Sequence, residues 1–144
     1  MPLVRVTKHA FTLVEILIVV VILGILAAVV AVQMAGATED ASVGTAIHEL
    51  RKLERAIEVY KARNDNAFPT VAAGDGTWGE LIGREYLKEA PTNPYVGGAN
   101  ATVIVLADAP DAAYQTAHGW IYSATTGDVW AGGFDASDSP LPRP

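Results

Sequence analysis

The chain has 144 residues, of which 51% are hydrophobic and 18% are charged, and its formal net charge is −6. This composition excludes a disordered chain, and the acidic balance argues against direct nucleic-acid binding because phosphate recognition needs a basic face. The chain has no cysteine, which excludes a disulfide framework, a thiolate nucleophile and a cysteine-ligated metal. We therefore expect one small domain and one additional, strongly apolar element.

The apolar element lies close to the N-terminus. Residues 11–32 carry a single charge, and as a helix rising about 1.5 Å per residue they match the roughly 30 Å hydrocarbon core of a bilayer. Arg5 and Lys8 precede this run, and the acids Glu39 and Asp40 follow it. Positive residues are retained on the cytoplasmic side, so the N-terminus is expected in the cytoplasm.

The same run also permits a secretory signal peptide or a plain membrane anchor. The small residues at positions 35–37 (AGA) would supply a signal-peptidase site. Two features argue against this interpretation. The run is longer than the roughly 7–15 apolar residues of a signal peptide. It also contains Glu15, and a carboxylate deep in a bilayer costs about 2.5–3.5 kcal/mol.

Glu15 requires a partner, and residues 11–32 contain no lysine or arginine. Cleavage between Ala10 and Phe11 would create an α-amino group at i,i+4 spacing from Glu15, on the same helix face. That amine would neutralise the carboxylate of its own chain or that of a neighbouring copy. The second case is self-assembly driven by pairing a charge in a dry environment.

Residues 10–15 (AFTLVE), with a basic leader before them and an apolar helix after them, resemble the processing site of type IV pilins and pseudopilins. The resemblance implies that residues 1–10 are a leader peptide, removed by a prepilin peptidase between Ala10 and Phe11. It also implies N-methylation of Phe11 and a role for Glu15 in subunit docking. The chain departs from the family in having Ala10 in place of glycine and Val32 in place of proline.

Residues 33–64 are expected to continue the apolar helix as an amphipathic one, because no proline interrupts the chain and apolar residues recur at i, i+3, i+4 and i+7. One helix from Phe11 to about Asn64 would therefore have a bare first half and a second half packed on the chain's own domain. A coiled coil or a partner-binding helix is the alternative. The apolar stripe consists of Val43, Ala46, Ile47, Leu50, Leu53, Ile57 and Tyr60.

Residues 65–131 are expected to form a small globular domain, and residues 132–144 an irregular tail. The pattern predicts a short helix at 77–86, a strand at 101–107, and a hairpin of 119–123 with 128–131. The helix exit, the proline-rich turn and the last hairpin are also similar to pseudopilins. The resemblance implies an α+β fold in which the long helix packs on a small antiparallel β-sheet.

No pattern points to catalysis, and we expect no enzyme activity and no cofactor. His9, His48 and His118 are far apart in the sequence, whereas a metal or catalytic site needs convergent side chains. Major pseudopilins, as a family, bind calcium through an acidic C-terminal loop. Calcium needs 6–8 oxygen ligands, to which Asp128, Asp135 and Asp138 would contribute; a solvated acidic tail is the favoured interpretation.

The resemblance implies a structural subunit of a pilus-like filament, above all a pseudopilin of type II secretion. The alternatives are a type IV pilin or minor pilin-like subunit for adhesion, motility or DNA uptake, and an exported domain on a plain anchor. The implied partners are other copies of the chain, a prepilin peptidase, an inner-membrane assembly platform and the bilayer before assembly. The implied location is the bacterial inner membrane with a periplasmic globular domain, then a periplasmic or extracellular filament.

Overall fold

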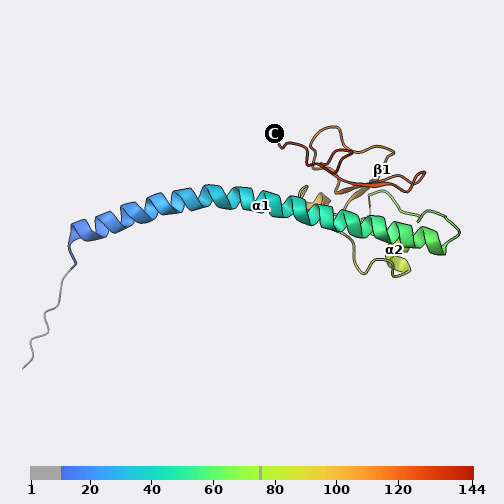
Figure 1. Cartoon of the computed structure of the whole chain (residues 1–144), viewed down its shortest axis with the longest axis horizontal. Helices are drawn as coiled ribbons and strands as arrows, with labels where there is room; N and C mark the ends of the chain where they lie inside the picture. The colour runs from blue at the N-terminus through green and yellow to red at the C-terminus, as the bar shows by residue number, and fades with distance from the viewer. Residues whose placement is uncertain (1–10, 75) are drawn as a thin grey trace, which may run out of the picture. The chain divides into compact units, whose positions relative to one another are not determined.

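The computed structural model describes residues 11–74 and 76–144, apart from the side chains of residues 32, 33 and 35. It divides into two compact units, one ending at Thr38 and one comprising Glu39–Pro144, which are described separately below. The elements in chain order are α1 (Leu13–Arg63), α2 (Glu80–Gly83), a 3-10 turn (Gly98–Asn100), β1 (Ile104–Leu106), β2 (Trp120–Tyr122) and β3 (Val129–Ala131). Figure 1 labels α1, α2 and β1.

The first unit contains the beginning of α1. Every side chain described between Phe11 and Ala31 is exposed, and the exposed fraction of the large apolar ones runs from 47% at Val19 to 83% at Leu13. Among the described helices, α1 alone is long and apolar enough to cross a membrane, by length and composition. The backbone stays helical at Val32 and onward to Arg63, without a break, so the predicted single helix is confirmed.

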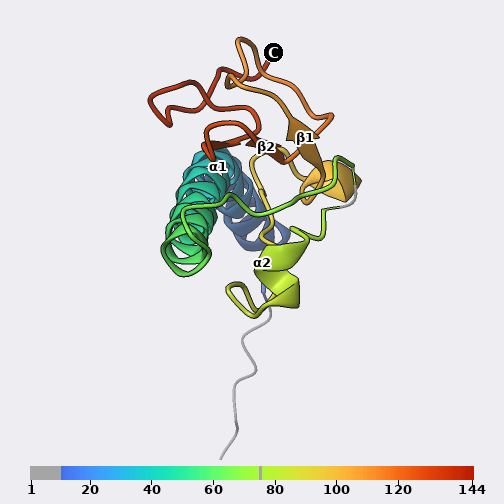
Figure 2. The same ribbon diagram turned by 90° about the vertical axis from the view of Figure 1, so that its right-hand side faces the viewer.

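The second half of α1 buries one face in the globular unit. Leu50, Leu53 and Ile57 are at most 3% exposed and belong to one hydrophobic core with residues of the strands and loops. Figures 1 and 2 both place the strands beside this part of the helix. The amphipathic stripe therefore packs on the chain's own domain, as predicted, because that contact removes its apolar side chains from water.

α1 ends where the sequence predicts. Asn64 follows the last helical residue, and its side-chain Nδ2 donates a hydrogen bond to the carbonyl of Tyr60 at 2.7 Å. Asp65 and Asn66 then adopt left-handed conformations with φ of 50° and 64°. Asparagine and aspartate tolerate this region, which stops a right-handed helix.

The three strands form one sheet in the order β1-β2-β3. β2 and β3 pair antiparallel, which confirms the predicted hairpin. β1 pairs parallel with β2, so the sheet is mixed, and the expectation of a wholly antiparallel sheet was wrong on this point. A parallel pair needs a connection of about a dozen residues or more, and residues 107–119 provide it.

Aromatic side chains dominate the core of the globular unit. Trp78, Trp120 and Tyr122 are fully buried, and the ring of Trp78 meets the other two edge to face at 6.5 and 5.9 Å between centroids. Trp78 has a φ of 56° and Glu85 a φ of 62°, which no right-handed helix allows. The helix predicted at 77–86 is therefore reduced to the single turn of α2, which Figure 2 labels.

Candidate processing and assembly site

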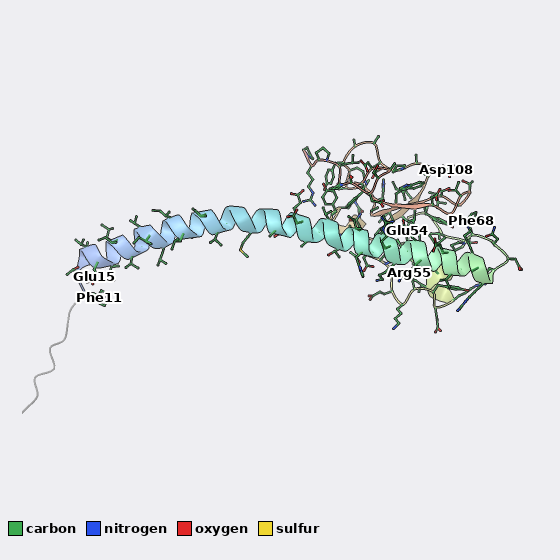
Figure 3. All side chains as sticks on the ribbon, viewed as in Figure 1. Phe11, Glu15, Glu54, Arg55, Phe68 and Asp108 are labelled. Carbon is green, nitrogen blue, oxygen red and sulfur yellow. The ribbon has the colours of Figure 1, made fainter. Side chains whose placement is uncertain are left out.

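The predicted site lies at the first turn of α1, where Figure 3 labels Phe11 and Glu15. The Thr12 hydroxyl oxygen accepts a hydrogen bond from the backbone N–H of Glu15 at 3.2 Å. The backbone N–H of Thr12 donates in return to a carboxylate oxygen of Glu15 at 3.5 Å. This reciprocal pair is a capping box, which satisfies two backbone donors that a helix start leaves without partners.

Glu15 is the only charged residue between positions 11 and 38. A carboxylate in the first turn is stabilised by the partial positive charge of the helix N-terminus. The long Thr12–Glu15 contact occupies one carboxylate oxygen, which leaves acceptor capacity on the group for a further donor. The site can therefore hold a cation or an amine close to the helix start.

The structure places two of the three predicted site residues. Phe11 and Glu15 are both exposed, and Phe11 has 74% of its surface accessible. Ala10 and His9 lie outside the described residues. Sequence reasoning missed the role of Thr12, although the spacing Thr-x-x-Glu before an apolar run is the signature of a capping box.

The globular unit does not assemble the predicted calcium donors into a site. Asp135 Oδ1 accepts hydrogen bonds from the N–H groups of Ser137 and Ser139 at 2.8 and 3.0 Å. Asp138 pairs with Arg51 at 2.7 Å. No three His, Cys, Asp or Glu side chains converge anywhere in the part of the chain that the structure describes. These acids do not fit the ligand set that calcium requires.

The histidines are likewise unsuited to a metal or catalytic site. His48 is exposed on α1. His118 Nε2 lies 3.2 Å from Asp111 Oδ1, and both side chains are mostly buried. That single pair offers too few ligands for zinc, which usually takes four.

A groove of about 570 Å³ runs beside α1 in the globular unit. Cationic and apolar side chains dominate its lining, and it has no serine, threonine or cysteine to act as a nucleophile. The residues that line it are His48, Arg51, Lys52, Arg55, Ala56, Val59, Arg63, Glu85, Tyr86, Leu87, Lys88 and Glu89.

The segment that contains Phe11 and Glu15 is similar in sequence to known proteins. The prokaryotic N-terminal methylation motif matches residues 5–31. The motif, the α+β fold and the long apolar helix together make the chain similar to prepilin-type, pilin-like proteins. The motif and the helix fit a protein that is anchored in a membrane and carries an exported domain.

Within that class the chain is pseudopilin-like. It is 37% identical over 87 residues to type II secretion system core protein G of Escherichia coli, a match that covers 60% of this chain and 53% of the relative. It is 39% identical to the protein of the same name from Vibrio cholerae, over 60% of this chain and 53% of the relative. The Aeromonas hydrophila protein is 42% identical over 46% of each chain.

The chain spans about half the length of the curated relatives that it matches. No solved structure matches it. The named relatives are components of a secretion system, which fits a structural role and not an enzymatic one.

Proposed function

We propose that this chain is a structural subunit of a pilus-like filament, namely a pseudopilin of a type II secretion system. Cleavage between Ala10 and Phe11 and methylation of Phe11 produce the mature subunit. One observation carries the proposal: Glu15 is the lone charge of residues 11–38, which include the exposed apolar part of α1, and it lies in the first turn, four residues after Phe11. The methylation motif and the core protein G relatives support it.

Assembly follows from the chemistry of that first turn. In a bilayer an unpaired Glu15 carboxylate is costly, by about 2.5–3.5 kcal/mol if it lies deep. Cleavage places the new amine of Phe11 at i,i+4 spacing from Glu15. Pairing this amine with the carboxylate of an adjacent copy offsets the cost and brings two apolar helices side by side. Docking is therefore favoured because it removes the free-energy cost of an unpaired Glu15 carboxylate in the bilayer.

The proposal includes the partners that such a subunit requires. The chain acts on itself to form a homopolymer, and a prepilin peptidase and an inner-membrane platform process and assemble it. Before assembly, residues 11–32 span the inner membrane with the N-terminus in the cytoplasm and the globular unit in the periplasm. Residues 16–31 of α1 are all Val, Ile, Leu, Ala or Gly and are all exposed, which supports this placement because so large an apolar surface is unfavourable in water.

Replacing Glu15 tests the proposal. Glu15→Leu should insert into the membrane and yet fail to enter filaments when the chain is expressed with a type II secretion system. Asp40→Asn, which removes an exposed acid from α1 beyond the apolar run, is the matched control and should assemble normally. The measurement is the amount of chain in the sheared filament fraction and in the membrane fraction.

The outcomes separate the three function classes. Filaments and secretion that are lost together support the pseudopilin. Filaments that are lost in Glu15→Leu without any effect on secretion indicate a pilin. If Glu15→Leu assembles as well as the unaltered chain, the carboxylate has no docking role and the plain anchor is the better interpretation.

A further inference from the structure

The turn between β2 and β3 is tied to a distant loop by a single carboxylate. Oδ1 of Asp108, in the connection from β1 to β2, accepts a hydrogen bond from the Ser123 hydroxyl at 2.6 Å. The same oxygen accepts a second hydrogen bond from the Thr125 hydroxyl at 2.8 Å. Hydrogen bonds to an ionised group are the stronger kind. Ser123 is 1% exposed, so water does not compete at its side of the contact.

The turn itself is closed by its own backbone and by a ring. Ser123 Oγ accepts from the N–H of Thr126 at 3.1 Å, and the Ser123 carbonyl accepts from the N–H of Gly127 at 2.8 Å. The ring of Phe68 packs so closely on Gly127 that an added Cβ would overlap it. Figure 3 labels Phe68 and Asp108, two side chains that reach this turn from other parts of the chain.

The rest of the C-terminal region is held in the same way. Oδ2 of Asp111 accepts from the N–H of Gly133 at 2.8 Å and from Nε2 of Gln115 at 2.7 Å. Arg143 donates to the carbonyl of Tyr95 at 2.7 Å and lies 4.3 Å from the centre of its ring. Asp108, Asp111 and Arg143 thus each join part of the chain after β1 to a protein donor or acceptor.

We propose that the C-terminal half of this globular unit folds without a bound divalent cation, and that Asp108 holds the 123–128 turn in the place of one. The carboxylates a cation would recruit already serve protein donors: Asp108 two hydroxyls, Asp135 two N–H groups and Asp138 a guanidinium. Calcium needs 6–8 oxygen ligands, whereas no three His, Cys, Asp or Glu side chains converge among the described residues. The inference goes beyond the proposed function, since it concerns the fold of one subunit and not its assembly.

Thermal unfolding of the full chain in detergent tests the proposal. After dialysis against EDTA, the Tm of the globular unit should be the same in EDTA and in calcium chloride. A ligand that binds the folded state alone raises the Tm with its concentration. A Tm that rises with added calcium would therefore overturn the proposal. The test needs no filament, so its result is independent of whether the chain is a pseudopilin.

Two variants examine the role assigned to Asp108. Thr125→Val, which keeps the shape of an exposed side chain and removes one hydroxyl, should lower the Tm by about 4–8 °C with or without calcium. Asp108→Asn should lower it as well. The matched control is Asp128→Asn in the same turn, whose side chain is exposed. If Asp128→Asn lowers the Tm only when calcium is present, the proposal is contradicted, because Asp128 would then bind the ion. Thr125→Val and Asp108→Asn variants with an unchanged Tm would also contradict it.

Discussion

Thr12 and Glu15 cap the start of α1 reciprocally, with the Thr12 hydroxyl bound to the Glu15 N–H and the Glu15 carboxylate bound to the Thr12 N–H. The Glu15 carboxylate, to which we assign a role in subunit assembly, therefore also caps the start of α1. A neighbouring amine that binds Glu15 would meet a carboxylate already oriented by its own chain. Preorganisation of this kind lowers the cost of ordering the side chain on docking.

The first prediction concerns this cap. Thr12→Val removes the hydroxyl acceptor and keeps the side-chain shape, so the first turn of α1 should lose about 1 kcal/mol of stability. Amide hydrogen exchange of residues 13–16 in detergent should become faster by about fivefold. Thr12→Ser retains the hydroxyl and should exchange like the unaltered chain. Equal exchange in Thr12→Val would mean that the capping box does not stabilise the helix start.

The second prediction concerns Asn93, which is fully buried. Its Nδ2 donates to the carbonyls of Gly119 and Gly132, both at 2.9 Å, and its Oδ1 accepts from the N–H groups of Tyr95 and Val96. Asn93→Ala leaves these backbone groups with fewer partners and opens a small cavity. It should lower the free energy of unfolding by about 3 kcal/mol or more.

Urea unfolding of the globular unit in the full chain measures this loss. Asn100→Ala is the matched control, because Asn100 is exposed and donates one hydrogen bond to the Thr116 carbonyl. It should cost about 1 kcal/mol or less. An equal effect of the two substitutions would show that Asn93 is not a central hydrogen-bonding residue of this fold.

The third prediction concerns acid stability. The N–H of Thr70 and the hydroxyl of Tyr60 donate to Glu80, and these hydrogen bonds hold the pKa of its carboxyl below the usual 4.5. A pKa that is lower in the folded state means that the stabilisation is present above the unfolded pKa. It is lost as the pH falls through the folded value. Stability should therefore decline below about pH 4.5.

Glu80→Gln should make the loss of stability at acid pH less steep, because the variant has no carboxyl to protonate at position 80. The Tm measured between neutral pH and about pH 3 gives the slope. Glu85→Gln is the control, since Glu85 is exposed and its side chain makes no hydrogen bond or ion pair with the described residues. A Glu80→Gln variant with an unchanged acid slope would contradict the assignment.

The fourth prediction pairs Gly127 with Phe68. Gly127 has a φ of 78°, and an added Cβ would overlap the Phe68 ring. Gly127→Ala should therefore destabilise the globular unit by about 2–3 kcal/mol through backbone strain and overpacking. In a Phe68→Leu background the overlap is relieved, so the same substitution should cost about 1 kcal/mol less. Additive effects in this double-mutant cycle would exclude a direct contact.

Local patterns in the sequence predicted the parts of the fold that depend on local structure. The apolar run, the i, i+3, i+4 stripe and the residues at 64–66 were sufficient to predict α1 and its end, since helix formation depends on near neighbours. The β2–β3 hairpin followed from two β-rich segments around a short turn. The recognised motif at residues 10–15 predicted the site at Phe11 and Glu15.

The remaining features depend on residues that are far apart in the sequence. Parallel pairing of β1 with β2 is set by the path of residues 107–119, which no local pattern specifies. Asp108 and its partner Ser123 are likewise joined across that connection. Side-chain hydrogen bonds of this kind appear only once the fold has brought the partners together. The Thr12–Glu15 cap differs from these long-range contacts, because its Thr-x-x-Glu spacing is a local motif that could have been predicted from the sequence.

The mass of the N-terminal peptide of the protein, isolated from its native membrane, tests the central claim most directly. Our account predicts a peptide that begins at Phe11 and carries one methyl group on its amine. That result would establish both the cleavage after Ala10 and the amine that we pair with Glu15. A mature chain beginning near Thr38, or one that retains Met1, would contradict the account and leave an exported domain on a signal peptide or a plain anchor.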